Sequence, residues 1–96
     1  MEKTKVVAPK EDLEACAQIF KALGHPSRLK IVEKLIDGEK CVLEIRELIV
    51  GSQPNISQHL NILKYSGIVD YRRDGKLRCY YLCEPDRIKS IIGCMD

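Results

Sequence analysis

The chain has 96 residues, of which 45% are hydrophobic and 31% charged, and its formal net charge is +2. This length leaves little material for a second core, so we expect one compact domain. Two copies of the chain can become more stable by sharing a core, so dimerisation is plausible. The sequence has no run of about 18 apolar residues and no apolar N-terminal signal, which excludes a membrane span and an export signal and indicates a cytoplasmic protein.

Helical spacing of apolar residues dominates the chain after a polar N-terminal tail over residues 1–10, which we expect to be flexible and to precede a single domain over residues 11–96. The spacing predicts four helices, over residues 11–23, 26–37 and 42–49 and from a Ser52 cap to residue 65. Gly24 and Gly38 suit positions just past two helix ends, and Pro26 suits the first turn of the second helix.

The fourth predicted helix has one apolar side and one polar side. Ile56, Leu60 and Leu63 recur at i, i+4 and i+7, which predicts a buried row. The opposite surface carries hydrogen-bonding side chains, namely Asn55, Ser57, Gln58, Asn61 and Lys64. Because such side chains can read base edges in a groove of DNA, this surface is a candidate for base contact.

The hydrophobic period changes from helical to two after Gly67. The dipeptide Asp74-Gly75 is a strong signal for a two-residue hairpin loop, because both central residues of that turn need positive φ. Pairing of Arg73 with Lys76 then predicts two faces, one with Val69, Tyr71, Arg73, Lys76, Arg78, Tyr80 and Leu82 and the other with Asp70, Arg72, Leu77, Cys79, Tyr81 and Cys83. Pro85 suits the opening of a short last helix.

These elements predict a mainly α fold with about five helices and a small β-hairpin that forms a two-stranded wing. Two short helices joined by a tight turn and followed by a basic hairpin describe a winged helix-turn-helix. In that arrangement the fourth helix enters the major groove of double-stranded DNA, and Arg72, Arg73 and Lys76 follow the phosphates beside it. The pattern therefore predicts a DNA-binding protein.

Three segments resemble the ArsR/SmtB family of winged-helix repressors: FKALGHPSRLKIVEKL (Phe20 to Leu35), SQPNISQHLNILKYSGIV (Ser52 to Val69) and YRRDGKLRCYYL (Tyr71 to Leu82). The resemblance implies a homodimer that binds operator DNA and leaves it when an inducer binds. It also implies that the DNA-reading helix carries Gln53, Asn55, Ser57, Gln58 and His59 and the wing Arg73 and Lys76. The dimer interface implied by the family uses the first and last helices, here with Leu13, Cys16, Phe20, Ile88, Ile91 and Ile92.

Several assignments have an alternative. His59 lies beside the apolar row, where a histidine more often completes packing or a hydrogen bond than reads a base. Cys16 can instead fill the apolar side of the first helix. A winged helix that only binds other proteins is the alternative from another class, but it would show an apolar outer face on the fourth helix. An enzyme is not expected, because no nucleophile, base and orienting residue recur at a suitable spacing.

The five cysteines, in a chain without an export signal, indicate reduced thiols rather than a disulfide framework. Cys41 stands at the start of the third helix, where the helix dipole favours a thiolate. Arsenic-sensing members of the family resemble ELCVCDL in this stretch, whereas this chain reads EKCVLEI, so Leu43 occupies the second ligand position. Further thiolates for As(III) would have to come from Cys16, Cys79, Cys83 or Cys94.

The first and last helices form the dimer interface in this family, so Cys16 and Cys94 can approach each other there. Together with Cys41 they are the candidate sensing residues. No cofactor is expected for folding. The first hypothesis for the inducer is a metalloid such as As(III) or a soft metal ion, and the alternative is oxidation or reactive-sulfur chemistry of the thiols. The last helix contains no histidine, which argues against a His-rich zinc site.

Overall fold

The computed structural model describes residues 10–49 and 55–93 of the chain. Within these residues five helices and three strands follow one another: α1 (Lys10–Leu23), α2 (Pro26–Leu35), β2 (Lys40–Cys41), α3 (Val42–Leu48), α4 (Ile56–Tyr65), β3 (Val69–Asp74), β4 (Leu77–Leu82) and α5 (Pro85–Gly93). Lys10 is the first residue of α1, and the rest of the predicted flexible tail lies outside the described residues. None of the described helices is long and apolar enough to cross a bilayer.

The predicted helices are present, but α2 ends at Leu35 rather than at residue 37, α3 ends at Leu48 rather than at residue 49, and α4 begins later than predicted. His25 is the N-cap of α2, and its Nδ1 accepts a hydrogen bond of 3.1 Å from the backbone N–H of Ser27. The prediction that Ser52 caps the fourth helix is wrong, because α4 begins at Ile56 with Asn55 as its N-cap residue. Asn55 has φ −100° and ψ 18°, which departs from helical values, so the helix starts after it.

The sheet has three antiparallel strands among the described residues, in the order β2-β4-β3. The two-residue strand β2 adds to the predicted two-stranded wing. The hairpin register differs from the prediction, because Arg73 pairs with Arg78 and Gly75 and Lys76 form the loop, with Gly75 at φ +66°. The difference is two residues along the ladder, and since side chains alternate with period two, the two predicted faces remain correct.

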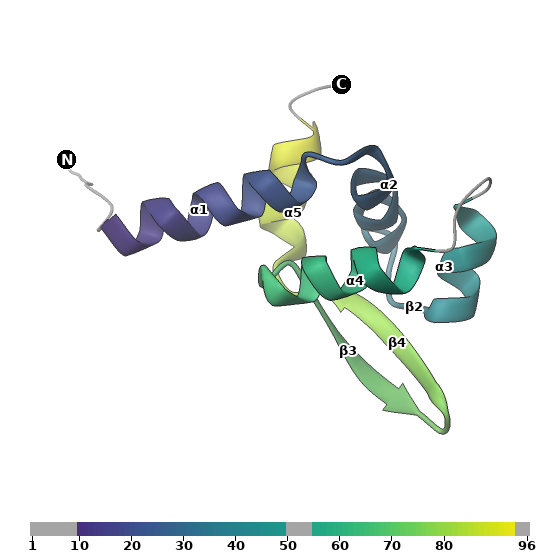
Figure 1. The fold of residues 1–96 in the computed structure, drawn as a ribbon. Coiled ribbons are helices and arrows are strands. Elements are labelled where there is room, and N and C mark those ends of the chain that lie inside the picture. The colour runs from purple at the N-terminus through teal and green to yellow at the C-terminus, as the bar shows by residue number, and fades with distance from the viewer. Residues whose placement is uncertain (1–9, 50–54, 94–96) are drawn as a thin grey trace.

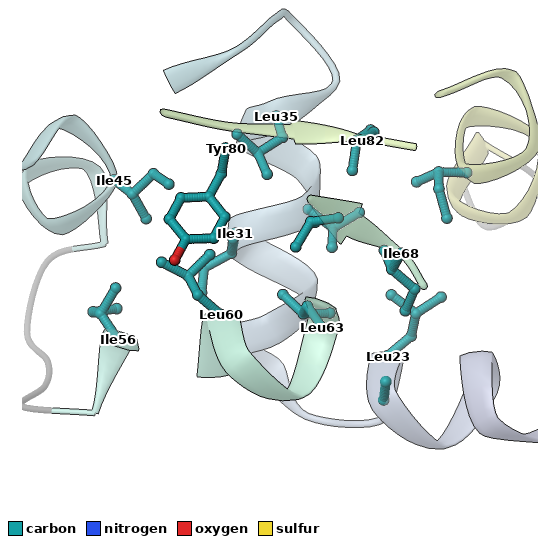
Figure 2. Packing of buried hydrophobic residues seen from close by; sticks show 14 of the residues in the cluster. Leu23, Ile31, Leu35, Ile45, Ile56, Leu60, Leu63, Ile68, Tyr80 and Leu82 are labelled. Carbon is teal, nitrogen blue, oxygen red and sulfur yellow. The ribbon is translucent and has the colours of Figure 1, made fainter. Parts of the chain in front are cut away.

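The hydrophobic core lies where α2, α4 and one face of the sheet meet (Figure 2). Its fully buried side chains come from all these elements and from α3: Ile31, Val32, Ile45, Leu60, Leu63 and Val69. The predicted row of Ile56, Leu60 and Leu63 on α4 is confirmed, with exposed fractions of 3%, 0% and 0%. Burial of this row fixes the rotation of α4 about its axis and therefore the side that α4 presents to solvent.

The arrangement in Figure 1 leaves two parts projecting from the core. The N-terminal half of α1 extends away from the other helices, and the hairpin β3–β4 extends from the opposite side of the molecule. On α1, Leu13 and Phe20 are 61% and 58% exposed. Two large apolar side chains on a projecting helix are a surface on which another chain can dock.

Candidate DNA interface and thiol pair

The outer surface of α4 is mostly polar, as the sequence predicted, although Ile62 and Tyr65 are also exposed on this helix. Five of the predicted contact residues are exposed on it or at its N-cap, namely Asn55, Ser57, Gln58, Asn61 and Lys64. Gln53 lies outside the described residues. Since the opposite side of the helix is locked in the core, these side chains form one hydrogen-bonding surface that projects from the domain.

Two residues of this surface already have partners within the chain. Ser57 Oγ accepts a hydrogen bond of 3.4 Å from Arg46 of α3. Lys64, in the last turn of α4, lies 4.0 Å from the carboxylate of Asp70 and 5.8 Å from the centre of the Tyr71 ring. These contacts join α4 to α3 on one side and to the wing on the other.

His59 points away from the polar surface. It is 9% exposed, its ring centre lies 4.5 Å from that of His25, and its Nδ1 lies 3.5 Å from a guanidinium nitrogen of Arg28. Arg28 Nε in turn donates a 2.6 Å hydrogen bond to the carbonyl of Ala22 at the end of α1. This placement favours the packing alternative for His59, in which the imidazole joins α4 to the corner between α1 and α2.

The pKa of His59 is lowered, first by burial of the imidazole and then by the charges of His25 and Arg28. The unfolded chain therefore binds a proton at His59 more readily than the folded chain does. Stability from this residue is present above the ordinary histidine pKa of about 6.5 and is lost as the pH falls through that value towards the lowered pKa of the folded state.

We expect the free energy of unfolding to fall between about pH 7 and pH 5, and to fall less in His59→Gln, which cannot titrate. Urea unfolding of both proteins at several pH values measures this difference. The carboxylates titrate in both proteins, so the comparison isolates the imidazole. Identical pH profiles would show that His59 is not the titrating group.

The wing presents a basic tip. Arg73, Lys76 and Arg78 are exposed, and the guanidinium of Arg78 lies 4.8 Å from the centre of the Tyr71 ring. Arg72 differs from its neighbours, because its guanidinium donates hydrogen bonds of 2.9 and 2.5 Å to the two carboxylate oxygens of Glu39. Arg73 and Lys76 thus extend from the tip, while Arg72 is engaged within the chain.

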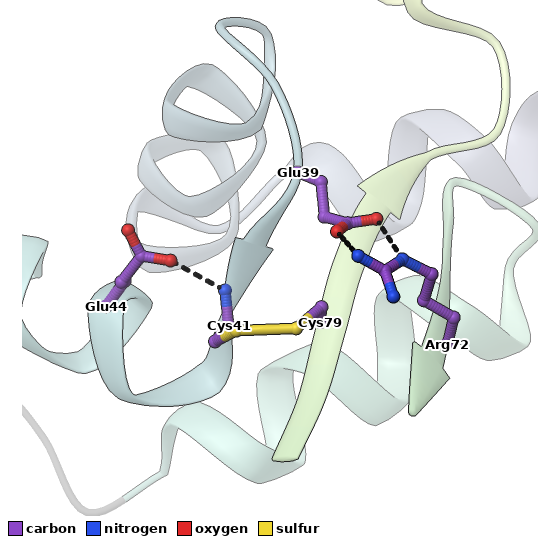
Figure 3. Close-up of polar contacts among 5 residues, drawn as sticks. All are labelled: Glu39, Cys41, Glu44, Arg72 and Cys79. Carbon is purple, nitrogen blue, oxygen red and sulfur yellow. Dashed lines mark hydrogen bonds and ion pairs between the residues drawn. A yellow bond between two sulfur atoms is a disulfide. The ribbon is translucent and has the colours of Figure 1, made fainter. Parts of the chain in front are cut away.

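The Glu39–Arg72 pair bridges the sheet (Figure 3). Glu39 directly precedes β2, and Arg72 lies on β3 at the other side of the central strand β4. The pKa of the Glu39 carboxyl is lowered, chiefly by the hydrogen bond from Arg72, and the pKa of Arg72 is raised by the same contact. Sequence reasoning missed Glu39, since only recognition of β2 would have shown that it reaches the wing.

Cys41 and Cys79 form a disulfide in this structure (Figure 3). The expectation of reduced thiols is therefore wrong for these two residues. Cys41 pairs with Cys79 in the ladder between β2 and β4, so the backbone itself brings them together. Cys41 is also the N-cap residue of α3, where its backbone N–H donates a 3.0 Å hydrogen bond to Glu44. The predicted position of Cys41 at a helix start is confirmed.

The other cysteines within the described parts of the chain are Cys16 and Cys83, both exposed thiols. Partial desolvation of the thiol, followed by the nearby carboxylates of Asp70 and Glu84, raises the pKa of Cys83. Cys94 lies outside the described residues, so its predicted grouping with Cys16 and Cys41 stays a prediction. In the parts of the chain that the structure describes, no three His, Cys, Asp or Glu side chains gather closely enough to hold a metal ion.

The residues predicted for a dimer interface fall into two groups. Leu13, Cys16 and Phe20 are exposed on α1, as an interface between copies requires. Ile88 of α5 is only 2% exposed and belongs to the core of a single chain, so here the prediction is corrected. Ile88 marks the side of α5 that packs on the domain. Ile91 and Ile92 are half-buried beside it.

The order and placement of α3, α4 and the hairpin β3–β4 define a winged helix-turn-helix, a class of DNA-binding domain. The family model for bacterial regulatory proteins of the arsR family matches residues 25–71, from the N-cap of α2 to the first half of the wing. The chain belongs to the ArsR/SmtB family of transcriptional repressors, which are DNA-binding regulators and not enzymes.

Two relatives and one solved structure show the extent of the similarity. The uncharacterized HTH-type transcriptional regulator MJ1325 of Methanocaldococcus jannaschii is 46% identical over 87 residues, which cover 90% of this chain and 97% of the relative. A cadmium resistance transcriptional regulatory protein CadC homolog of Staphylococcus aureus is 39% identical over 77 residues, covering 79% and 63%. The homodimeric winged helix-turn-helix DNA-binding domain Mb0332 of Mycobacterium bovis has a TM-score of 0.78 at 30% identity, covering 88% and 81%.

Proposed function

We propose that this chain is a homodimeric repressor that binds double-stranded operator DNA through α4 and the wing and leaves it when a thiol-reactive inducer acts at Cys41. The observation that carries DNA binding is the polar surface of α4, fixed by the buried row on its other side and placed beside a basic wing. Short polar side chains on such a helix read base edges, and cations on a hairpin bind phosphates. Since its ligand is chromosomal DNA, we also propose a cytoplasmic location.

A selection from a random pool of DNA duplexes would identify the operator and test the proposal. Gln58→Ala should then lose about 1 to 3 kcal/mol of binding free energy on the selected duplex, and little on a scrambled one. Fluorescence anisotropy with both duplexes measures the two losses. Glu33→Ala, which removes an exposed side chain of similar length from α2, is the control and should leave the ratio of the two affinities unchanged. Equal losses on both duplexes would place the reading residues elsewhere.

The proposed dimer uses the exposed apolar side of α1. Mb0332, which shares this fold, is homodimeric, and Leu13 and Phe20 give α1 the apolar surface that a dimer would cover. Phe20→Ser should shift the dimer to monomer by about 2 kcal/mol or more, since a large aromatic anchor is lost. Sedimentation velocity over a range of concentrations measures this shift. Leu48→Ser on α3, which also alters an exposed apolar residue, should leave the dimer intact.

Two kinds of thiol-reactive inducer remain candidates for Cys41. A metalloid such as As(III) or a soft metal ion, the first hypothesis, agrees with the cadmium resistance regulator among the relatives, but trigonal As(III) needs a third ligand. An oxidant needs only two thiols, and the bond between Cys41 and Cys79 supports this alternative. A metal ion should bind reversibly at one ion per site, whereas oxidation should remove titratable thiols until a reductant restores them.

A further inference from the structure

One row across the sheet holds two sulfur atoms and a cation. Cys79 of β4 lies directly opposite Cys41 on β2 and directly opposite Arg72 on β3. Directly opposed residues share a face of the sheet, so the three side chains lie on the same side. Glu39, two residues before Cys41, holds Arg72 through both carboxylate oxygens (Figure 3). A disulfide and an ion pair therefore fasten the same short segment onto the wing.

We propose that Cys41 and Cys79 are a reversible redox switch, whose disulfide form holds Glu39 against Arg72 and so weakens operator binding. The inference rests on the proposed operator binding and names the regulation of that site. The oxidant is a hydroperoxide such as hydrogen peroxide, and the reductant is a dithiol. The switch differs from the grouping with Cys16 and Cys94, because both sulfurs lie within the helix-turn-helix and wing of one chain.

Burial sets the order of the oxidation. Cys41 is half-buried whereas Cys79 is 2% exposed, so the peroxide reaches Cys41 first. The Cys41 thiolate attacks one peroxide oxygen, the S–O bond forms as the O–O bond breaks, and the released hydroxide takes up the thiol proton to give water. The Cys79 thiol then displaces the hydroxyl of the sulfenic acid as a second water, and the S–S bond forms. Two thiols and one hydrogen peroxide thus give one disulfide and two waters.

The strand β2 transmits the oxidation state to Arg72. It has two residues, paired as Lys40 with Tyr80 and Cys41 with Cys79, so the disulfide is a large part of what holds it to β4. Reduction leaves β2 and the adjoining Glu39 held by a short ladder and an exposed ion pair, which is a weak interaction in water. Arg72 can then leave Glu39 for a DNA phosphate, and the Glu39 carboxylate no longer opposes the phosphates.

The experiment compares operator binding by the full chain after reduction with a dithiol and after treatment with hydrogen peroxide. One phosphate contact per protomer contributes up to about 30-fold to dimer affinity at about 0.15 M salt, so the oxidised protein should bind about 10- to 30-fold more weakly. It should also lose two titratable thiols per chain and yield the cross-linked Cys41–Cys79 peptide in mass spectrometry. Circular dichroism confirms that both forms are folded.

Variants test each step. Cys79→Ser should bind like the reduced wild type under both conditions, and Cys41→Ser, at a less buried position, serves if Cys79→Ser folds poorly. The matched control Cys83→Ser, at an exposed thiol outside the proposed dimer interface, should respond to peroxide as the wild type does. Glu39→Gln should still form the bridge, yet its two forms should differ by less than about threefold. A full redox response in Glu39→Gln would overturn the role of Glu39.

Two outcomes overturn the switch itself. One is that the oxidised and reduced wild type bind the operator with equal affinity although only the oxidised form contains the disulfide. The other is a bridge that hydrogen peroxide does not form or a dithiol does not break. Failure of the reduced wild type to bind any duplex would instead overturn the proposed function, and the thiol count would still report on the chemistry of the pair.

Discussion

The double variant Arg73→Gln, Lys76→Gln should bind the operator about 1000-fold more weakly than the wild type at about 0.15 M salt, because a dimer loses four phosphate contacts and each contributes about 0.7 logarithmic units there. Both side chains are exposed at or beside the loop of the wing, and no residue of the core depends on them. The slope of log K against log salt should become shallower by about 3.6. Fluorescence anisotropy titrations at several salt concentrations measure both quantities.

The control for this loss of affinity removes two positive charges from another part of the molecule. Lys34 and Lys89 line a hollow between α2 and α5, on the side of the molecule remote from the wing tip (Figure 1). The double variant Lys34→Gln, Lys89→Gln should change the affinity and the salt slope much less than the wing variant does. If the two double variants lose affinity equally, only the net charge matters and the wing does not follow the phosphates.

Reduction of the disulfide should lower the free energy of unfolding by about 4 kcal/mol, the value expected when a cross-link over 38 residues is opened. The bridge closes a loop that contains α3, α4 and β3, so its removal restores conformational entropy to much of the unfolded chain. Urea unfolding with and without a dithiol measures the change, as a fall of about 2 M in the midpoint for an m-value of about 2 kcal/mol/M. Protein concentration must be equal in both titrations, since a dimer gains stability with concentration.

The double variant Cys41→Ser, Cys79→Ser provides the reference for that experiment. Its unfolding curve should not respond to the dithiol, and it should lie near the curve of the reduced wild type. Cys83→Ser, at an exposed position outside the proposed dimer interface, should keep the full response. A wild-type midpoint that does not move when both thiols become titratable would show that the unfolded chain is already restricted without the bridge.

Local signals predicted the helices well. Pro26 and Pro85 begin α2 and α5, and Gly38, at φ +138°, lies in the turn after α2, whereas Gly24 follows α1 without the positive φ expected for it. The start of α4 was placed too early, because Ser52 is a plausible cap and the backbone of Asn55 decides the boundary. Propensity ranks such caps but does not choose between two that are three residues apart.

The polar surface of α4 was predictable from local spacing, because the buried row at Ile56, Leu60 and Leu63 determines which side of the helix faces solvent. The same row indicated packing as one alternative for His59, at its edge, but the partners of this imidazole could not be predicted. These partners are His25 and Arg28, at the start of α2, and Arg28 is 31 residues away from His59 in the sequence. Contacts between distant segments carry no periodic signal in the sequence.

The pairing of Cys41 with Cys79 could not be predicted from the sequence either, because it joins distant segments of the chain. Cys41 was recognised from its position at a helix start, but its partner Cys79 lies 38 residues away on the wing. Their meeting depends on β2, a strand of two residues that is too short to show alternation. The predicted face shared by Arg72 and Cys79 was correct, but the predicted register did not place these two residues opposite each other, and β2 beside Cys79 was missing from the prediction.

The hairpin register also bears on how the wing can vary in length. Because Gly75 and Lys76 close a two-residue loop, insertion of one residue into each strand lengthens the hairpin without disturbing the ladder beneath it. An insertion into one strand alone either enlarges the loop or slides that strand by one position, which would turn Tyr80 and Leu82 out of the core. The reach of the wing along the DNA backbone is therefore adjustable in discrete steps of about 3.4 Å, each requiring a pair of residues.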